Sequence, residues 1–363
     1  MAKVVFLTFN DMPGGIFSSQ VVDVCVFLKE QLNYEVTLVS FVSLRGFSTV
    51  KQKICAQFPD AIVLPMFPGV GRWAKNGWLL RKQLRKINPQ TIIARGPFAA
   101  ALALRNSSAT VCFDARGAYA AEFSEYDVSG GKIKLDEIKA IESEAIKSSP
   151  RLLAVSSALV RYWKSEYAYN ESKHVIIPCT MSHVNTEATS QPENRDTVRI
   201  VFAGGNGKWQ SLDMMSQLLI PAFEKDSRLE LIMLTRADQN SIELKRRFAD
   251  RVKIMWLPES EVHSVLSSCD YGWLVREDSV TNKVASPVKF AEYLSAGLSV
   301  IVSRELGDFS SFIREHGCGL IAGETELLSL HQQTTEERTR NIQLAMNYFS
   351  KEKYREEYRR CVE

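Results

Sequence analysis

The stretch YGWLVREDSVTNKVASPVKFAEYLSAGLSVIVS, residues 271–303, indicates how this chain folds. It begins with a short apolar run at 271–275, which predicts a β-strand. A polar loop, the dipeptide Ser286-Pro287 and a helical pattern follow, and a glycine ends the helix before a β-branched run at 299–302. Strand, loop, helix and strand in this order form the repeating unit of a parallel α/β sheet.

Two basic residues of this unit occupy places where proteins bind anions. Arg276 directly follows the first strand, at the carboxyl end where open parallel sheets bind ligands. Pro287 suits a helix start, where the first turn has N–H groups free to donate to an anion. Glu292 lies one turn after Lys289 on the same helix face, where a carboxylate can accept from two sugar hydroxyls. The pattern favours a phosphate-bearing substrate.

Ordinary alternatives remain for these residues. Arg276 and Lys289 could each be solvated surface, and Glu292 could be a local charge partner of Lys289. We expect Arg276 to be an exposed cation that contributes little to stability.

The composition is that of a soluble globular protein. The chain has 363 residues, of which 45% are apolar and 24% charged, and its net charge of +3 does not by itself indicate nucleic acid. The seven cysteines are scattered and form no C-x-x-C, which argues against a disulfide scaffold or zinc site and favours a reducing compartment. The chain shows no signal peptide and no apolar run of about 18 residues, so we expect a cytoplasmic protein.

Two successive strand–helix series predict two domains. The first series spans residues 1–181, a polar linker covers 182–197, the second series spans 198–333, and the charged tail 334–363 contains one long helical pattern. The expected fold is α/β, with two doubly wound Rossmann-like domains facing a cleft. The predicted strands are 4–9, 35–41, 61–66, 91–94, 110–113, 152–155 and 174–177 in the first series, and 198–202, 229–235, 252–256, 271–275 and 299–302 in the second.

The second series supplies cations rather than carboxylates for binding phosphate. It has no D-x-D pair and no G-x-x-x-x-G-K-[ST], but Lys208 follows a glycine turn at 204–207 and adds to Arg276 and Lys289. We therefore expect a nucleoside diphosphate to bind without a metal ion or other cofactor.

The segment 271–302 resembles the donor-site signature of retaining glycosyltransferases of family 4, closest to the branch that assembles bacterial capsule, exopolysaccharide and lipopolysaccharide. The resemblance implies the GT-B fold, with a nucleotide sugar on the C-terminal domain and the acceptor on the N-terminal domain. Gly14-Gly15 resembles the glycine loop near the donor phosphates, and Trp256-Leu257-Pro258 resembles the loop that holds the nucleobase. The segments 92–97 and 113–117 resemble motifs of the N-terminal domain that face the cleft, and the helix at 334–360 resembles one that crosses back to that domain.

The resemblance also implies how the site works. The leaving diphosphate helps to deprotonate the acceptor, so the protein mainly stabilises charge, through Arg276 first and then Lys289 and Lys208. Asp114, a candidate catalytic residue, is placed with Arg116 and Arg95 on the acceptor side, although a turn with an internal ion pair is an alternative. The expected donor-binding residues are Gly14, Gly15, Gly204, Asn206, Lys208, Leu257, Arg276, Ser286, Pro287, Val288, Lys289 and Glu292.

Two positions depart from the family pattern. Val284 stands where the wider family has the first of two glutamates, and Gly205 stands where it often has an arginine. We expect Arg276 to supply the missing phosphate charge, and backbone amides of 285–288 to contact the sugar.

The segment 72–86 is basic and carries no acidic residue. Its pattern fits a helix lying on an anionic membrane surface, and slightly better a helix whose apolar face packs on the sheet of its own domain. The residues expected to meet the membrane are Arg72, Trp73, Lys75, Trp78, Arg81, Lys82, Arg85 and Lys86.

The expected activity is that of a hexosyltransferase-type glycosyltransferase (EC 2.4), acting on a glycan or polyprenyl-linked acceptor. It would work in the cytoplasm or on the inner face of the cell membrane. Two alternatives remain: an epimerase of the same shape, and a non-catalytic partner subunit of a polysaccharide assembly complex. A phosphorylase is disfavoured, because no lysine is framed by glycines as pyridoxal phosphate requires. A hydrolase is disfavoured too, because motifs such as H-E-x-x-H and G-x-S-x-G are absent.

Overall fold

Seven strands form the first of two parallel sheets. In a computed structural model, which describes residues 1–66, 70–127, 133–181, 195–205, 207–324 and 330–363, their spatial order is β3-β2-β1-β4-β5-β6-β7. Neighbouring strands pair in parallel, which leaves both faces of the sheet to be covered by helices. The strands are β1 (Lys3–Phe9), β2 (Glu35–Ser43), β3 (Ile62–Met66), β4 (Thr91–Arg95), β5 (Thr110–Ala115), β6 (Arg151–Ala154) and β7 (His174–Ile176).

The second sheet has six strands in the order β10-β9-β8-β11-β12-β13, and they too pair in parallel. In both sheets the strand order reverses next to the first strand of the series, between β1 and β4 and between β8 and β11. Doubly wound sheets bind ligands at the carboxyl ends of the strands at such a switch point. The strands are β8 (Val198–Ala203), β9 (Leu229–Leu234), β10 (Val252–Met255), β11 (Tyr271–Leu274), β12 (Ser299–Val302) and β13 (Gly319–Ile321).

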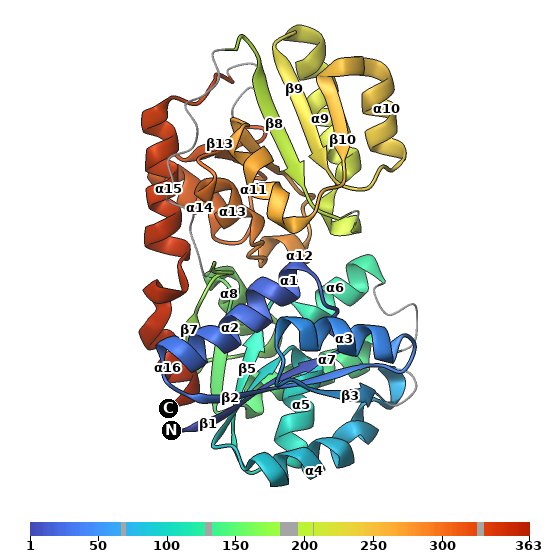
Figure 1. Cartoon of the computed structure of the whole chain (residues 1–363), viewed down its shortest axis with the longest axis vertical. Coiled ribbons are helices and arrows are strands. Elements are labelled where there is room, and N and C mark those ends of the chain that lie inside the picture. The colour runs from blue at the N-terminus through green and yellow to red at the C-terminus, as the bar shows by residue number, and fades with distance from the viewer. Residues whose placement is uncertain (67–69, 128–132, 182–194, 206, 325–329) are drawn as a thin grey trace. The chain divides into compact units, whose positions relative to one another are not determined.

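Helices connect the strands of both sheets (Figure 1). Those of the first series are α1 (Gly15–Phe17), η1 (Ser18–Val22), α2 (Asp23–Val26), η2 (Phe27–Gln31), α3 (Phe47–Gln57), η3 (Val70–Asn76), α4 (Gly77–Ile87), α5 (Pro97–Asn106), α6 (Tyr119–Tyr126), α7 (Leu135–Ser148) and α8 (Ser157–Tyr167). Those that follow are η4 (Lys208–Gln210), α9 (Leu212–Lys225), α10 (Gln239–Phe248), η5 (Ala249–Arg251), α11 (Glu259–Ser267), α12 (Val280–Lys283), α13 (Lys289–Ser295), α14 (Phe309–His316), α15 (Thr335–Phe349), η7 (Lys351–Tyr354) and α16 (Arg355–Val362).

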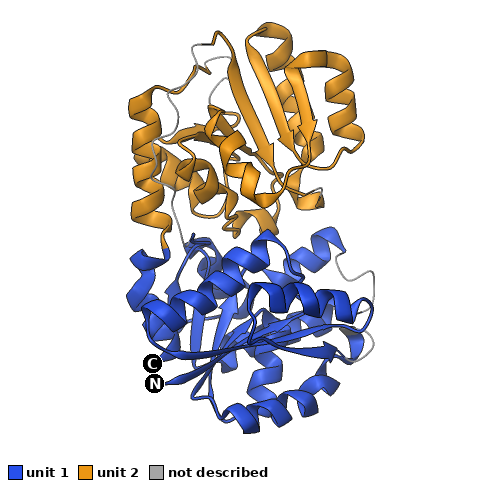
Figure 2. Cartoon of the chain, in the orientation of Figure 1, with its two compact units in different colours: residues 1–182, 351–363 blue, residues 183–350 orange. Residues whose placement is uncertain are grey.

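The chain divides into two compact units, coloured separately in Figure 2. Unit 1 holds residues 1–182 and 351–363, and unit 2 holds residues 183–350. The predicted α/β class with two doubly wound domains is confirmed. The assignment of acceptor binding to 1–181 and nucleotide-sugar binding to 198–333 stays a prediction, and residues 182–194 of the expected linker lie outside the described residues.

The structure corrects two expectations about elements. The tail is not one long helix: α15 ends at Phe349, and the 3-10 turn η7 separates it from α16. Ser350 has an extended backbone (φ −77°, ψ 145°), which interrupts the helical hydrogen bonds. The strand β13 was not predicted: its three residues begin with a glycine, a residue that is depleted in strands.

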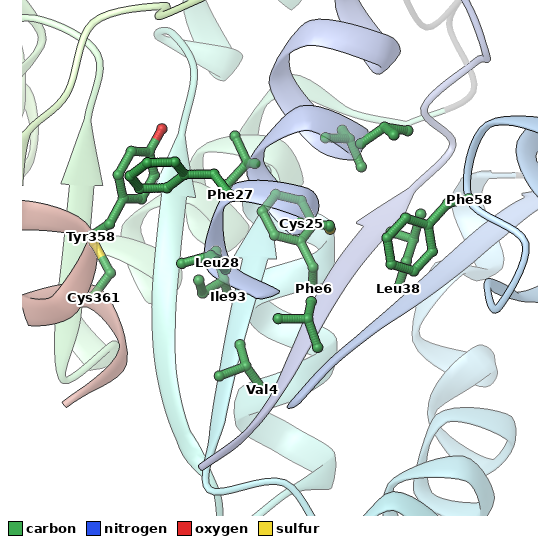
Figure 3. Close-up of a cluster of buried hydrophobic side chains, with 14 of the residues drawn as sticks. Val4, Phe6, Cys25, Phe27, Leu28, Leu38, Phe58, Ile93, Tyr358 and Cys361 are labelled. Atoms are coloured by element: carbon green, nitrogen blue, oxygen red, sulfur yellow. The ribbon is translucent and has the colours of Figure 1, made fainter. Parts of the chain in front are cut away.

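The last helix contributes to the core of unit 1. Figure 3 shows Tyr358 and Cys361 of α16 beside Phe27, near Val4 and Phe6 of β1. The rings of Phe27 and Tyr358 have their centroids 5.4 Å apart. The same helix is fixed by its final carbonyl, since Val362 O accepts hydrogen bonds from Thr91 Oγ1 at 2.7 Å and from Arg151 Nη1 at 2.6 Å.

Candidate functional site

Arg276 lies at the switch point of the second sheet, just past the carboxyl end of β11. Its backbone N–H donates to Ser303 Oγ at 2.6 Å, and that hydroxyl donates to the Arg276 carbonyl at the same distance. Only 7% of Arg276 is exposed, so the expectation of an exposed strand-end cation is wrong. The reason is that segments after β8 and β11 contact its side chain, while Ser303 after β12 holds its backbone.

Two amide side chains accept hydrogen bonds from the Arg276 guanidinium. Asn282 Oδ1 lies 3.4 Å from Nη1, and Gln210 Oε1 lies 3.4 Å from Nη2. Gln210 Oε1 also accepts from Lys289 Nζ at 2.9 Å. The structure therefore brings Arg276 and Lys289 together around one neutral oxygen.

Lys289 begins α13 and reaches back over the end of β8. Its Nζ lies 4.6 Å from the centre of the Phe202 ring, and a Cβ atom at Gly204 would lie 2.0 Å from it. Burial, together with the charge of Arg276, lowers the pKa of Lys289 from 10.5 to about 7, against a smaller opposing effect of Glu292. Two clustered basic groups, of which Lys289 has a pKa of about 7, are suited to binding an anion that arrives from solution.

Glu292 lies one turn further along α13 and is partly buried. Burial raises the pKa of its carboxyl, Lys289 opposes that shift, and Glu259 at the start of α11 adds to it. Within the described part of the chain, Glu292 and Lys289 form no ion pair, because the Lys289 ammonium is directed to Gln210 instead. The effect of Glu259 on Glu292 indicates that the loop after β10 lies near this site.

Aromatic packing holds α13 in position. The Phe290 and Phe309 rings stack with centroids 4.1 Å apart, and Phe349 of α15 packs edge-on against both. Tyr293 Oη accepts a hydrogen bond from the Ala203 backbone N–H at 2.9 Å, which joins α13 to the end of β8. Locked side chains of this kind keep the residues of a binding site in place before the ligand arrives.

The remaining predicted donor residues of unit 2 differ in their exposure. Lys208 is exposed on η4, Leu257 is partly buried, and Ser286 is buried. The helix begins at Lys289, so Pro287 and Val288 lie just before it rather than inside it. Asn206 lies outside the described residues.

The predicted glycines Gly14 and Gly15 lie in unit 1, at the start of the helical segment after β1. Both are exposed, and a Cβ atom at Gly14 would meet nothing within 4 Å. Crowding therefore does not explain the glycine at position 14.

A buried ion-pair network lies at the switch point of unit 1. The Asp114 carboxylate is 0% exposed and lies 2.8 Å from Arg116 Nε and 3.9 Å from Arg95 Nη1. Arg95 Nε also pairs with Asp11 Oδ1 at 3.1 Å, a residue that the sequence analysis did not identify. The three predicted acceptor-side residues are thus brought together. The same pairing is also expected if these residues form only a structural ion pair and do not bind the acceptor.

The basic segment 72–86 buries part of its apolar face and exposes its basic residues, and membrane binding stays a prediction. Trp73 is buried against Phe98, with ring centroids 5.5 Å apart, and the Arg105 guanidinium lies over the Trp73 ring, 4.9 Å from its centroid. Trp73 is therefore not available to a membrane, and Leu80 and Leu84 are buried as well. Trp78 is 53% exposed, and the basic residues exposed with it are Arg72, Lys75, Arg81, Lys82, Arg85 and Lys86.

The described residues show neither a metal cluster nor a membrane-spanning helix. They contain no group of three or more His, Cys, Asp or Glu side chains that could hold a metal ion. Among them there is also no helix with both the length and the apolar character needed to cross a bilayer.

Comparison with solved structures identifies the architecture. No protein-family model matches the sequence, and no curated protein matches it significantly. The lipopolysaccharide outer core galactosyltransferase WaaB superposes with a TM-score of 0.70 at 13% identity, covering 99% of each chain. A TarM variant from S. aureus, in complex with UDP, Fondaparinux and alpha-GlcNAc-glycerol, gives 0.68 at 10% identity over 100% of each chain.

A protein described as a UDP-N-acetylglucosamine 2-epimerase from Listeria monocytogenes is also similar. It gives a TM-score of 0.55 at 14% identity and covers 99% of this chain and 91% of its own. The chain thus has the GT-B fold of two Rossmann-like domains, which glycosyltransferases share with this epimerase.

Proposed function

We propose that this chain is a glycosyltransferase that moves a sugar from a UDP- or GDP-sugar to a glycan or polyprenyl-linked acceptor. The observation that carries the proposal is the pair of cations, Arg276 and Lys289, held around Gln210 at the switch point of unit 2. Solved GT-B glycosyltransferases of the same architecture support it, one of them in complex with UDP.

The proposed reaction retains the configuration of the anomeric carbon. The bond from that carbon to the diphosphate oxygen breaks, and the electron pair leaves with the diphosphate. The acceptor oxygen bonds to the same face of the carbon, and its proton passes to an oxygen of the leaving diphosphate. This route needs no strong protein base and no metal ion.

Arg276 and Lys289 would stabilise the charge that develops on the leaving group. Loss of one such donor typically raises a barrier by about 2.7–4 kcal/mol. Glu292 would accept hydrogen bonds from sugar hydroxyls, a role for which its partly buried position beside Lys289 is suited. Lys208, exposed on η4, would add a weaker attraction for the phosphates.

The acceptor would bind to unit 1 near Asp114, Arg116 and Arg95. Asp114 would then act mainly by orienting the two guanidinium groups, because its carboxylate is enclosed between them. A role in bacterial surface polysaccharide assembly follows from the resemblance of residues 271–302, and the likeness to an outer core galactosyltransferase is consistent with it.

The exposed face of α4 would place the enzyme on the inner surface of the cell membrane. Four exposed basic residues of α4, two more in the preceding η3 and the exposed Trp78 are the features of an interfacial helix, even though Trp73 and Leu80 pack inward. A lipid-linked acceptor would be met at that surface.

An epimerase is the second candidate, because a protein described as one shares the fold. The deciding experiment incubates the protein with a panel of UDP- and GDP-sugars, with and without glycan acceptors, and measures release of free nucleoside diphosphate. Slow hydrolytic release of UDP or GDP from one donor supports the transferase. Conversion of a UDP-sugar to its epimer without release would identify the epimerase. No reaction with any donor would favour a non-catalytic partner subunit.

A further inference from the structure

Gln210 is the residue that joins the two cations of the site. It is 9% exposed, and its side-chain Oε1 accepts from Lys289 Nζ at 2.9 Å and from Arg276 Nη2 at 3.4 Å. Only the oxygen of an amide can accept from two cations, so the chemistry of the neighbours fixes how this amide is oriented.

The backbone around Gln210 is held firmly. Its N–H donates to the Gly207 carbonyl at 2.9 Å, and the next residue, Ser211, accepts at Oγ from the Glu277 N–H at 2.9 Å. The turn after β8 is thereby tied to the loop after β11. The Gln210 amide is thus held beside the cations, because its own turn is fixed to the loop after β11 at the switch point.

The amide oxygen is a weak substitute for an anion. It carries only a partial negative charge, whereas each oxygen of a diphosphate carries most of a full one, and hydrogen bonds to charged acceptors are stronger. With this neutral acceptor, Lys289 gains little to offset its burial and the charge of Arg276, which agrees with its pKa of about 7. The other charges near it are Glu292 on its own helix and, through Glu292, Glu259 of α11.

We infer that Gln210 is a positioning residue that holds the place of a donor phosphate oxygen between Arg276 and Lys289, and that donor binding displaces it while Lys289 takes up a proton. This inference rests on the proposed function of the same site. To that function it adds a role for Gln210, the replacement of its amide oxygen by a phosphate oxygen at Arg276 and Lys289, and the protonation of Lys289.

The consequence for pH has a definite sign. Lys289 is charged below about pH 7 in the free protein, and a bound diphosphate raises its pKa. The contribution of Lys289 to affinity for the diphosphate is therefore fully present below about pH 7. It falls about tenfold per pH unit above that value, until the pKa of Lys289 in the complex is reached.

The first measurement needs no ligand. The reactivity of Lys289 toward an amine-acylating reagent is followed against pH by mass spectrometry of its peptide, in the wild type, Gln210→Ala and Gln210→Glu. We expect the midpoint to rise by more than a pH unit in Gln210→Glu, because a carboxylate stabilises the ammonium, and to fall in Gln210→Ala. Equal midpoints in all three proteins would overturn the inference, whatever the enzyme does.

The second measurement is calorimetry of UDP, GDP and inorganic pyrophosphate at about pH 8, where the terminal phosphate of a nucleoside diphosphate is already ionised. Runs in two buffers of different ionisation enthalpy give the proton uptake. Lys289→Arg, which stays charged, isolates the contribution of Lys289. We expect nearly one proton taken up by the wild type and none by Lys289→Arg. We also expect binding at least about tenfold weaker in Gln210→Glu, where the carboxylate competes with phosphate.

The outcomes separate the two claims. UDP or GDP binding without Lys289-dependent proton uptake overturns the inference and leaves the proposed function intact. Pyrophosphate binding with that uptake, but no binding of UDP or GDP, supports the inference and overturns the proposed function. If Lys289→Arg does not fold, the shift of the pH profile in Gln210→Glu decides alone. If none of the three ligands binds, both fail.

Discussion

Gly204 and Lys289 are in such close contact that a Cβ atom at position 204 would lie 2.0 Å from the lysine Nζ. Any side chain at 204 must displace the ammonium from the space it shares with Gln210. The first glycine of the turn after β8 is therefore required by the position of a side chain that lies far along the sequence.

Gly204→Ala should weaken nucleotide binding more than it destabilises the fold. We expect affinity for UDP or GDP to fall about tenfold, as for the loss of one charged hydrogen bond, and a cost to folding of about 1 kcal/mol from backbone strain. Titration and thermal unfolding measure the two effects. Gly205→Ala is the matched control, because a Cβ there meets nothing within 4 Å. Equal losses in both variants would contradict the explanation.

Arg276→Ala should reduce turnover about 10²–10³-fold, the effect of removing one preorganised donor. Because Arg276 is buried, the variant should also lose about 1–3 kcal/mol of unfolding free energy, as Gln210 and Asn282 lose a partner. Steady-state kinetics and denaturant unfolding test both. Arg304→Ala removes an exposed arginine of the same unit and should change neither. Full activity in Arg276→Ala would show that this residue does not contact the diphosphate.

Glu292→Gln should weaken binding of the nucleotide sugar while leaving α13 intact, since glutamine has similar helix propensity but no charge for the sugar hydroxyls. Binding of the sugar nucleotide and of the free nucleoside diphosphate should be compared, because the loss should be larger for the former. Glu261→Gln, at an exposed position of α11, serves as the control. Unchanged affinity would mean that Glu292 acts only on its local surroundings.

Binding of UDP or GDP should persist in excess chelator. The cations Arg276 and Lys289 would neutralise the diphosphate charge that a metal ion otherwise neutralises. Titration with and without chelator should give the same dissociation constant. If binding disappears with chelator and returns with magnesium or manganese, metal independence is wrong.

Anionic vesicles should bind the protein through α4. Replacing Arg81, Lys82, Arg85 and Lys86 with Gln should release it, since each cation near such a surface contributes about 1 kcal/mol. Raising the salt concentration should do the same through screening. Vesicle sedimentation measures this, and a comparison of Arg81→Gln with Lys82→Gln on α4 against Lys51→Gln with Lys53→Gln on α3 controls for net charge, since each pair removes two cations. Salt-independent failure of the wild type to bind would instead favour an acceptor delivered by a partner protein.

The strand–helix alternation could be predicted because buried parallel strands are short apolar runs that contrast with amphipathic helices. The same pattern placed Arg276 just after a predicted strand and Lys289 at the start of a predicted helix. Both positions lie at the same edge of a parallel sheet, so the two residues were expected to lie close together. The pattern could not predict that Arg276 is buried, because its surroundings come from segments after three different strands. The break at Ser350 was missed since one extended residue leaves the helical pattern on either side unchanged.

Gln210 was missed for a different reason. An uncharged amide after a glycine turn is an ordinary loop residue in sequence, and its importance depends on two cations that lie 66 and 79 positions away. Asp11 is similar, since only its contact with Arg95 distinguishes it from other loop aspartates. Residues whose role is to hold other residues carry no pattern of their own.

The return of α16 to unit 1 determines the order in which the protein can be completed during synthesis. Tyr358, Cys361 and Val362 are part of the unit 1 core, and Val362 O accepts from both Thr91 and Arg151. Residues 351–363 leave the ribosome only after all of unit 2 has been made. The unit encoded first is therefore finished only after the second, and its core stays partly exposed to water until residues 351–363 have been made.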